Sequence, residues 1–178
     1  LLTKVVSVNT VDKVVKLSDG SLQPYDQLLI ATGSNQPTRP LSCPGCDLEG
    51  VMLLQSYEDA KDIHTLSMGR KAVVIGTSFI GMEAASYLSD KAVSVAVVGT
   101  SAYPFEHSLG QEIGQMTMQM LEEHGVKFYM KSGVSEIREH NGKVKEVVLK
   151  DGQVLEADVV ILGIGDVYLS AGKCLNCN

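Results

Sequence analysis

Long apolar runs are missing from this sequence, and so is any basic stretch followed by an apolar one at its start. A helix needs roughly 20 consecutive apolar residues to cross a bilayer, and a secretory signal peptide needs both a basic and an apolar segment. We therefore expect no membrane span and no targeting signal within these residues. A chain that begins with Leu1 rather than Met is expected to be part of a longer protein, whose targeting signals could lie elsewhere.

Positive charge is also scarce. Fifteen Lys and Arg residues stand against 21 Asp and Glu residues, which gives a net charge of −6 at pH 7. This balance would repel the phosphate backbone of a nucleic acid, so DNA and RNA are not expected partners. Hydrophobic residues make up 44% of the chain, which is enough to bury a core and excludes an intrinsically disordered protein.

Tryptophan is absent, whereas glycine occurs 17 times. Together with the order of the segments, this composition predicts an α/β chain that is rich in loops. At roughly 150 residues per domain, the 178 residues correspond to one complete domain and part of a second.

The first part of the chain predicts short strands, a linker and one helix. Antiparallel strands are expected at 2–8 and 11–17, and Asp19-Gly20 is a strong hairpin signal. Leu28–Ala31 is apolar on both faces, which is typical of a buried strand. Proline clusters between positions 35 and 50 and marks a linker, and Ser56 is expected to cap a helix that extends to about Leu66.

From Lys71 the pattern becomes strand, glycine loop and helix, and it ends in a β-meander. Buried strands are predicted over 72–75, 93–98, 127–130 and 158–162, and meander strands over 134–139, 144–149 and 154–156. A helix is predicted over 111–124, with Ile113, Met116, Met120 and Leu121 on one face. We expect this face to be buried, because a helix that lies on a parallel sheet must bury one face.

The loop Gly76-Thr77-Ser78-Phe79-Ile80-Gly81 is the most informative motif, because it follows a predicted buried strand and opens a helix. This context is that of a dinucleotide-binding fingerprint. Gly76 would allow the tight turn, Gly81 would let the helix approach the sheet, and the helix N-terminus would hold the pyrophosphate. Ser78 replaces the middle glycine of the fingerprint, so its Cβ is expected to crowd the ligand. The alternative is a Rossmann-like turn that has lost its ligand.

The acidic residue that normally binds the ribose hydroxyls is missing, and Gly99-Thr100 stands in its place. Ser101 or Glu106 could replace it, as could Thr100, although each could equally be an ordinary loop residue. No Arg or Lys lies between Gly99 and His107 to bind a 2′-phosphate. NAD(H) is therefore favoured over NADP(H), because a 2′-phosphate would have no evident partner. We expect the difference in affinity between the two nucleotides to be small.

Four cysteines form two Cys-x-x-Cys pairs, Cys43 with Cys46 and Cys174 with Cys177. The two pairs lie much farther apart than those of a zinc ribbon. We expect four ordinary thiols of a reducing compartment, and the alternatives are a shared zinc site or a redox role for Cys43 and Cys46. No second ligand stands four residues after any histidine, so no metal site is predicted.

Three segments resemble the flavoprotein pyridine-nucleotide oxidoreductases in their order and spacing. They are Tyr25–Ser34, which contains Ala31-Thr32-Gly33, then Gly76–Glu83, and finally Ala157–Gly165. Pro104-Phe105-Glu106 with Leu109-Gly110, and the segment 125–130, resemble more particularly the apoptosis-inducing factor group of this family. The resemblance covers about residues 1–165.

The resemblance implies an α/β fold of two parts. Residues 71–165 would form a Rossmann-type NAD(P)H-binding domain with a parallel sheet and an antiparallel β-meander, and residues 1–40 part of an FAD-binding domain with antiparallel strands. Residues 41–70 would be a linker with a short helix. Residues 166–178 depart from the family as a divergent tail, and the family's FAD loop and closing Gly-Asp motif are not found. A splice variant or a truncated product is the expected cause.

The same resemblance implies the cofactors, NAD(H) or NADP(H) for this domain and FAD for the full-length protein. The glycine loop, Gly99-Thr100 and Gly163-Ile164-Gly165 would contact the nicotinamide nucleotide, and Ala31-Thr32-Gly33 would lie on the FAD side. Glu83 would lie near the nicotinamide as a candidate catalytic residue. Its alternative role is that of an acid stabilised by the helix dipole.

The implied reaction is hydride transfer from NAD(P)H to FAD, followed by one-electron transfer to an iron–sulfur or other acceptor. The group includes a Rieske-type ferredoxin fused to such a reductase. The resemblance implies a mitochondrial location, and the alternative is a cytoplasmic one. Because hydride transfer resides in the flavin, we expect the isolated chain to be inactive as an enzyme. The alternative is a non-catalytic module that binds a nucleotide or a partner.

Overall fold

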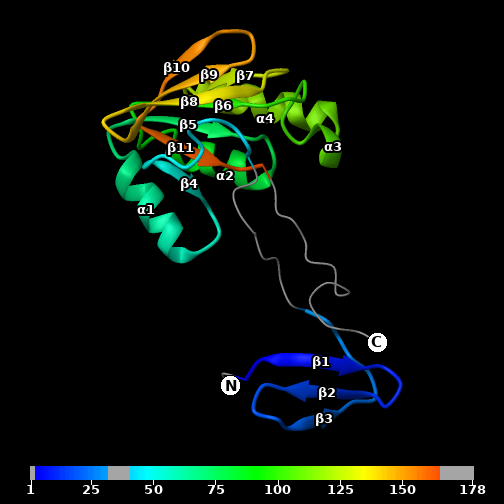
Figure 1. Cartoon of the computed structure of the whole chain (residues 1–178). Coiled ribbons are helices and arrows are strands. Elements are labelled where there is room, and N and C mark those ends of the chain that lie inside the picture. The colour runs from blue at the N-terminus through cyan, green and yellow to red at the C-terminus, as the bar shows by residue number, and fades with distance from the viewer. Residues whose placement is uncertain (1–2, 32–40, 165–178) are drawn as a thin grey trace. The chain divides into compact units, whose positions relative to one another are not determined.

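The computed structural model describes residues 3–31 and 41–164 and divides into two units, shown in Figure 1. The described part of the first unit is an antiparallel sheet in the order β1-β2-β3. Its strands are β1 (Val5–Asn9), β2 (Val14–Leu17) and β3 (Leu22–Pro24). Val8 and Val15 form its small buried core. The hairpin signal at Asp19-Gly20 is confirmed, because it lies in the turn between β2 and β3.

The strand predicted over Leu28–Ala31 does not form, so that prediction is wrong. The segment has no regular secondary structure, and Leu29 is 88% exposed. A parallel strand needs partners for its backbone N–H and C=O groups. Among the residues that the structure describes, no strand pairs with this segment, and its apolar side chains are left exposed.

The second unit has three layers around a parallel sheet with the order β4-β11-β5-β6-β7 (Figure 1). Helices α1 and α2 cover one face, and the antiparallel sheet β10-β9-β8 covers the other. This combination confirms the predicted fold class. The elements are β4 (Val51–Leu53), α1 (Tyr57–Ser67), β5 (Lys71–Ile75), α2 (Phe79–Leu88), β6 (Ser94–Val98), α3 (Glu106–Leu109), α4 (Gln111–Glu123), β7 (Lys127–Tyr129), β8 (Val134–His140), β9 (Lys143–Leu149), β10 (Val154–Glu156) and β11 (Val159–Leu162).

Alternation along the central strands divides the core into two clusters. Val73 and Ile75 of β5 pack toward the antiparallel sheet, whereas Ala72 and Val74 pack toward the helices. A strand that is buried on both faces has to be apolar at every position, which is why these strands were recognisable in the sequence. The edge strand β4 was not predicted, because three apolar residues after a proline-rich segment are too few to show the hydrophobic periodicity of a strand.

Helix α1 starts where the sequence predicts. The Ser56 hydroxyl accepts a hydrogen bond from the backbone N–H of Asp59 at 3.1 Å, and the Asp59 carboxylate accepts one from the backbone N–H of Ser56 at 2.9 Å. This reciprocal pair satisfies two N–H groups that a helix start otherwise leaves open. None of the helices in the described ranges is long and apolar enough to cross a membrane.

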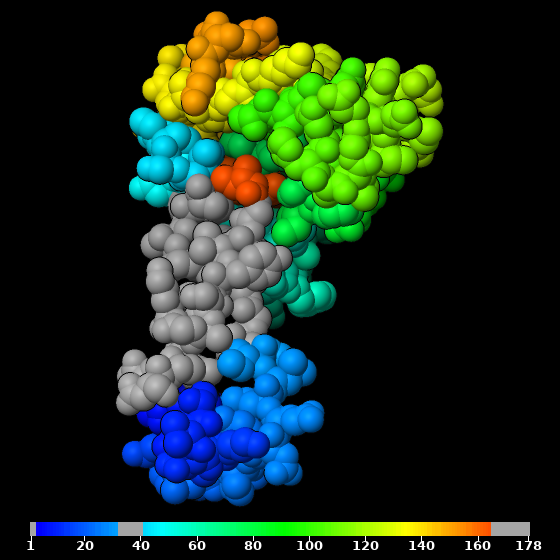
Figure 2. Space-filling view, turned by 90° about the vertical axis from the view of Figure 1, so that its right-hand side faces the viewer, coloured from blue at the N-terminus to red at the C-terminus, as the bar shows by residue number. Residues whose placement is uncertain are grey.

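Helix α4 forms as predicted, but it buries a different face. Met116 and Met120 are 60% and 58% exposed, so the predicted burial of the methionine face is wrong. The helix packs instead through Gly114, where a Cβ atom would lie 2.2 Å from the backbone oxygen of Pro104. This close approach rotates the buried face, and only Leu121 of the predicted set packs on the core. In Figure 2, α3 and α4 form the yellow-green surface of the second unit.

Cys43 and Cys46 are joined by a disulfide, so the expectation of ordinary thiols is wrong for this pair. The turn that they close packs on β8. Gly45 has a φ of +82°, and a Cβ there would lie 1.9 Å from the backbone oxygen of Ile137. The backbone oxygen of Pro44 also accepts a hydrogen bond from the Ile137 N–H at 2.8 Å. Cys174 and Cys177 lie outside the described residues.

Candidate functional site

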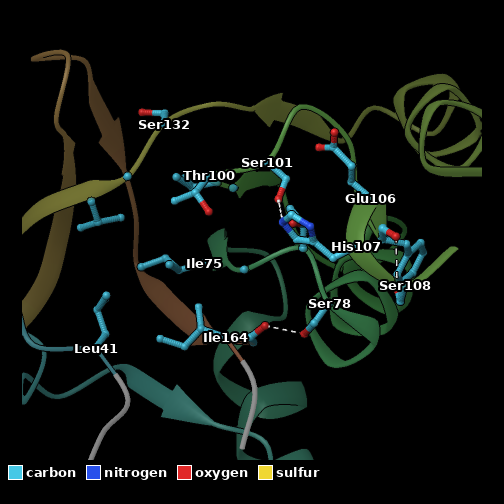
Figure 3. A pocket seen from close by; sticks show the side chains of 18 of the residues that line it. Leu41, Ile75, Ser78, Thr100, Ser101, Glu106, His107, Ser108, Ser132 and Ile164 are labelled. Atoms are coloured by element: carbon cyan, nitrogen blue, oxygen red, sulfur yellow. Dashed lines mark hydrogen bonds between the residues drawn. The ribbon is translucent and has the colours of Figure 1, made fainter. Parts of the chain in front are cut away.

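A pocket of about 410 Å³ opens at the carboxyl ends of β5, β6 and β11 (Figure 3). Its walls are the glycine loop, the β6–α3 loop, the segment between β7 and β8, and the turn after β9. In open α/β sheets, ligands bind outside the carboxyl ends of the parallel strands. The pocket is therefore the candidate site for a nucleotide.

Two glycines bring the loop, the helix and the sheet into close contact. Gly76 has a φ of +113°, and a Cβ there would lie 2.3 Å from the backbone oxygen of Gly163. At Gly81, a Cβ would lie 2.2 Å from the backbone oxygen of Gly76. Both contacts are with backbone atoms, which cannot move aside. The tight turn and the close helix approach expected at these glycines are thus both present.

Ser78 fastens the glycine loop to the last strand of the sheet. Its hydroxyl donates a hydrogen bond of 2.7 Å to the backbone oxygen of Gly163 (Figure 3). Ser78 is also the N-cap residue of α2, but its side chain makes no capping bond. The hydroxyl therefore holds the loop in place, a role that the sequence did not reveal.

A pair of substitutions at Ser78 separates this hydrogen bond from the expected crowding by the Cβ. Both Ser78→Ala and Ser78→Gly remove the hydroxyl, and we expect each to lower the free energy of unfolding by about 1 kcal/mol. Only Ser78→Gly removes the Cβ, so it should bind NADH more tightly than Ser78→Ala. Urea unfolding and NADH titration of both variants test this. Equal affinities would show that the Cβ does not touch the pyrophosphate.

The β6–α3 loop runs beside the segment that follows β7. The backbone N–H of Ser132 donates to the oxygen of Gly99, and that of Lys131 donates to the oxygen of Ser101, each at 3.0 Å. A Cβ at Gly99 would lie 2.5 Å from Cγ2 of Thr77. A side chain at position 99 would thus clash with Thr77 unless Thr77 changed its rotamer.

Glu106 lines the pocket, but its carboxylate is engaged within its own loop. One oxygen accepts hydrogen bonds from the backbone N–H groups of Ala102 at 2.8 Å and Tyr103 at 3.4 Å, and the other accepts one from Nε2 of Gln111 at 3.0 Å. The Gln111 bond, followed by the Ala102 bond, lowers the pKa of the Glu106 carboxyl. Glu106 is therefore ionised and braces the loop, which makes it a poor replacement for the missing ribose ligand.

Phe105 joins this loop to the glycine loop. Its backbone N–H donates to the oxygen of Thr77 at 3.1 Å, and its ring lies 4.9 Å from that of Phe79. Phe105 adopts a φ of +56°, which is unusual for a bulky residue. These contacts make one continuous wall from the two loops.

The predicted site residues do not all come together. Phe79, Ile80 and Gly81 do not line the pocket, and those that do are Gly76, Thr77, Ser78, Gly99, Thr100, Gly163 and Ile164. Glu83 is exposed and lines a different groove, beside Ile63 of α1 and Tyr87 of α2. Ala31 is an exposed residue of the first unit. Thr32, Gly33 and Gly165 lie outside the described residues.

Several lining residues were missed in the sequence, among them Leu41, His107, Ser132 and Lys150. The segment from Gly99 to His107 contains no Lys or Arg, but the turn after β9 brings Lys150 to the same pocket. Lys150 is thus a cation of the pocket that the residues between Gly99 and His107 do not reveal. Only the predicted meander could have suggested it, by returning the chain to this edge of the sheet.

A family model described as pyridine nucleotide-disulphide oxidoreductase matches residues 1–172. Apoptosis-inducing factor 3 of Mus musculus is 47% identical over 164 residues, which cover 92% of this chain and 27% of that protein. Rubredoxin-NAD(+) reductase of Pseudomonas putida is 33% identical over 168 residues, which cover 94% of this chain and 43% of that protein. The chain thus spans less than half the length of these relatives.

Solved structures agree with the fold. A ferredoxin reductase for the CYP199A2 system of Rhodopseudomonas palustris matches with a TM-score of 0.81 at 26% identity, over 94% of this chain and 41% of that chain. The reductase in the covalent putidaredoxin reductase–putidaredoxin complex matches with a TM-score of 0.78 at 30% identity, over 93% of this chain and 40% of that chain.

Proposed function

Because the chain belongs to the pyridine nucleotide-disulphide oxidoreductase family, we propose that it forms the NAD(P)H-binding portion of an FAD-dependent oxidoreductase. The family uses FAD and NAD(P)H. The observation that carries the proposal is the pocket at the carboxyl edge of the sheet, with the glycine loop and Ser78, the N-cap residue of α2, at its wall. A helix start with a close-packed glycine loop is suited to bind a pyrophosphate.

In this proposal, the residues of the chain bind and orient the nucleotide. Gly76 and Gly81 keep side chains out of the way, and Ser78 holds the loop against β11 through Gly163. When bound, the nicotinamide supplies a hydride to the flavin. Glu83 stays the candidate for the nicotinamide end because of the family resemblance of the segment Gly76–Glu83, and it is exposed on α2, outside the pocket.

We propose an iron–sulfur protein as the electron acceptor of the whole enzyme. Relatives named rubredoxin-NAD(+) reductase and a complex of putidaredoxin reductase with putidaredoxin support this class of partner. The likeness to apoptosis-inducing factor 3 supports a mitochondrial location.

A non-catalytic nucleotide-binding module is the second candidate for the isolated chain. The segment Leu28–Ala31, expected on the FAD side, is irregular and exposed, so the described residues form no strand there that could support a flavin. Without flavin the chain would bind nucleotide and transfer no hydride.

Binding of NADH and FAD to the 178-residue chain tests these proposals. We expect NADH to bind with a dissociation constant at least about tenfold below that of FAD, because the pocket for the nicotinamide nucleotide is the one that is formed. Calorimetric titrations measure both constants, and an absorption spectrum of the purified chain shows whether flavin remains bound. Tighter binding of FAD than of NADH would contradict the assignment of the pocket.

A further inference from the structure

The end of β6 is the place where a dinucleotide-binding fold meets the ribose of the adenosine, usually through a carboxylate on the 2′-hydroxyl. In this chain the position is Gly99, and Thr77 limits the space for a side chain there. The carboxylate that would repel a 2′-phosphate is therefore absent. Discrimination between the two nucleotides depends on the groups that surround Gly99.

Hydroxyl and imidazole groups stand around this position. Oγ of Ser101 lies 3.3 Å from Nε2 of His107, and both side chains line the pocket (Figure 3). Ser132, whose backbone is bonded to Gly99, also lines it. Its hydroxyl is buried and has no hydrogen-bond partner within the described part of the chain. Buried polar groups are nearly always paired, and the unpaired Ser132 hydroxyl could turn about its Cα–Cβ bond to donate to a ligand oxygen in the pocket.

A cation completes the surroundings. Lys150 lines the pocket, and its side chain passes Gly133. Cδ and Cε of Lys150 each lie 3.3 Å from the point where a Cβ on Gly133 would be. In residues 3–31 and 41–164, no ion pair engages Lys150. The carboxylate of the pocket, Glu106, is already bonded to three N–H groups. The Lys150 ammonium is therefore available to a ligand in the pocket, whereas the Glu106 carboxylate keeps its negative charge but is held within its own loop.

We propose that this pocket takes NADP(H) in preference to NAD(H), and that Lys150, His107, Ser101 and Ser132 bind the 2′-phosphate. The inference rests on the proposed function and specifies its substrate. An ammonium group is an effective point charge for a phosphate, and hydroxyl and imidazole N–H groups donate to its oxygens. These residues come from α3, its preceding loop, the segment before β8 and the turn after β9, which explains why no contiguous motif announces them.

Two small nucleotides measure the contribution of the 2′-phosphate to binding. Adenosine 2′,5′-bisphosphate and adenosine 5′-monophosphate differ only in that group, and NADP⁺ and NAD⁺ form the corresponding pair of full cofactors. Calorimetric titration of the 178-residue chain should give dissociation constants about tenfold or more lower for the phosphorylated member of each pair. In Lys150→Gln we expect this ratio to fall about tenfold, with the affinity for NAD⁺ unchanged.

Lys61→Gln is the matched control, because it removes the same charge from the exposed side of α1, outside the pocket. It should leave the ratio unchanged. Lys131→Gln tests the neighbouring cation, whose side chain does not line the pocket. Equal affinities for the members of each pair, or tighter binding of NAD⁺, would overturn the inference while leaving the proposed function intact. A larger effect of Lys131→Gln than of Lys150→Gln would overturn the assignment of Lys150. If none of the four nucleotides binds to the folded chain, the proposed function itself fails.

Discussion

Gly81→Val is expected to abolish binding of nicotinamide nucleotides, with a loss of at least a hundredfold in affinity, or about 2.7 kcal/mol. Even the first carbon of the new side chain would lie 2.2 Å from the backbone oxygen of Gly76 and 3.5 Å from that of Gly163. Both atoms belong to the turn and strand that form the pocket wall. Helix α2 would have to move away from the sheet, and the start of the helix would move away from the pyrophosphate.

Loss of binding must be separated from loss of the fold, since overpacking typically costs about 1–3 kcal/mol in stability. Thermal melting of Gly81→Val and of the milder Gly81→Ala measures this cost. Gly142→Ala is the control: it costs stability through backbone strain, at a φ of +79°, but its Cβ would meet no atom within 4 Å. We expect this control to be slightly destabilised and to bind normally. A folded Gly81→Val chain with the NADH affinity of the unsubstituted chain would place the site elsewhere.

The sheet and the glycine loop were predictable because their signals are local. Strands β5, β6 and β11 are buried on both faces, so each is a continuous apolar run that needs no knowledge of its neighbours. The loop from Gly76 to Gly81 owes its geometry to two glycines whose spacing is visible in the sequence. In both cases, the residues that determine the structure are adjacent along the chain.

Burial was not predictable where it depended on distant partners. The apolar face of α4 was expected to lie on the sheet, but Gly114 offers a closer approach to Pro104 and rotates the helix. Leu28–Ala31 is an apolar run with no described strand beside it. An apolar pattern predicts that a segment seeks burial, whereas its neighbours decide whether it finds any.

The candidate site divides in the same way. The glycine loop, proposed to bind the pyrophosphate, is a contiguous motif that is visible in the sequence. The side around Gly99 is assembled from Ser101, His107, Ser132 and Lys150, which lie on separate elements. Similarly, the disulfide of Cys43 and Cys46 depends on a turn that is braced by β8, which the cysteine spacing alone could not show.

Cofactor preference is expected to reverse when a carboxylate is introduced at the end of β6 together with the space that it needs. Gly99→Glu alone should weaken binding of both NADP⁺ and NAD⁺, because the new Cβ would lie 2.5 Å from Cγ2 of Thr77. Thr77→Ala removes that methyl group. In the double variant, the glutamate should accept a hydrogen bond from the ribose 2′-hydroxyl of NAD⁺ and repel the phosphate of NADP⁺.

The new hydrogen bond to NAD⁺ and the repulsion of NADP⁺ are each expected to lower the ratio of NADP⁺ to NAD⁺ affinity about tenfold. Together they should lower this ratio about a hundredfold, or about 2.7 kcal/mol. The relevant control is Thr77→Ala alone, which changes the wall of the pocket without adding charge and should leave the ratio within about twofold of that of the unsubstituted chain. The test needs the dissociation constants of NADP⁺ and NAD⁺ for the unsubstituted chain, the two single variants and the double variant. A double variant that binds NAD⁺ and keeps the original ratio would show that the 2′-position does not lie beside Gly99. In that case the phosphate would have no reason to meet Ser101, His107, Ser132 or Lys150 either, because these residues surround the same end of β6.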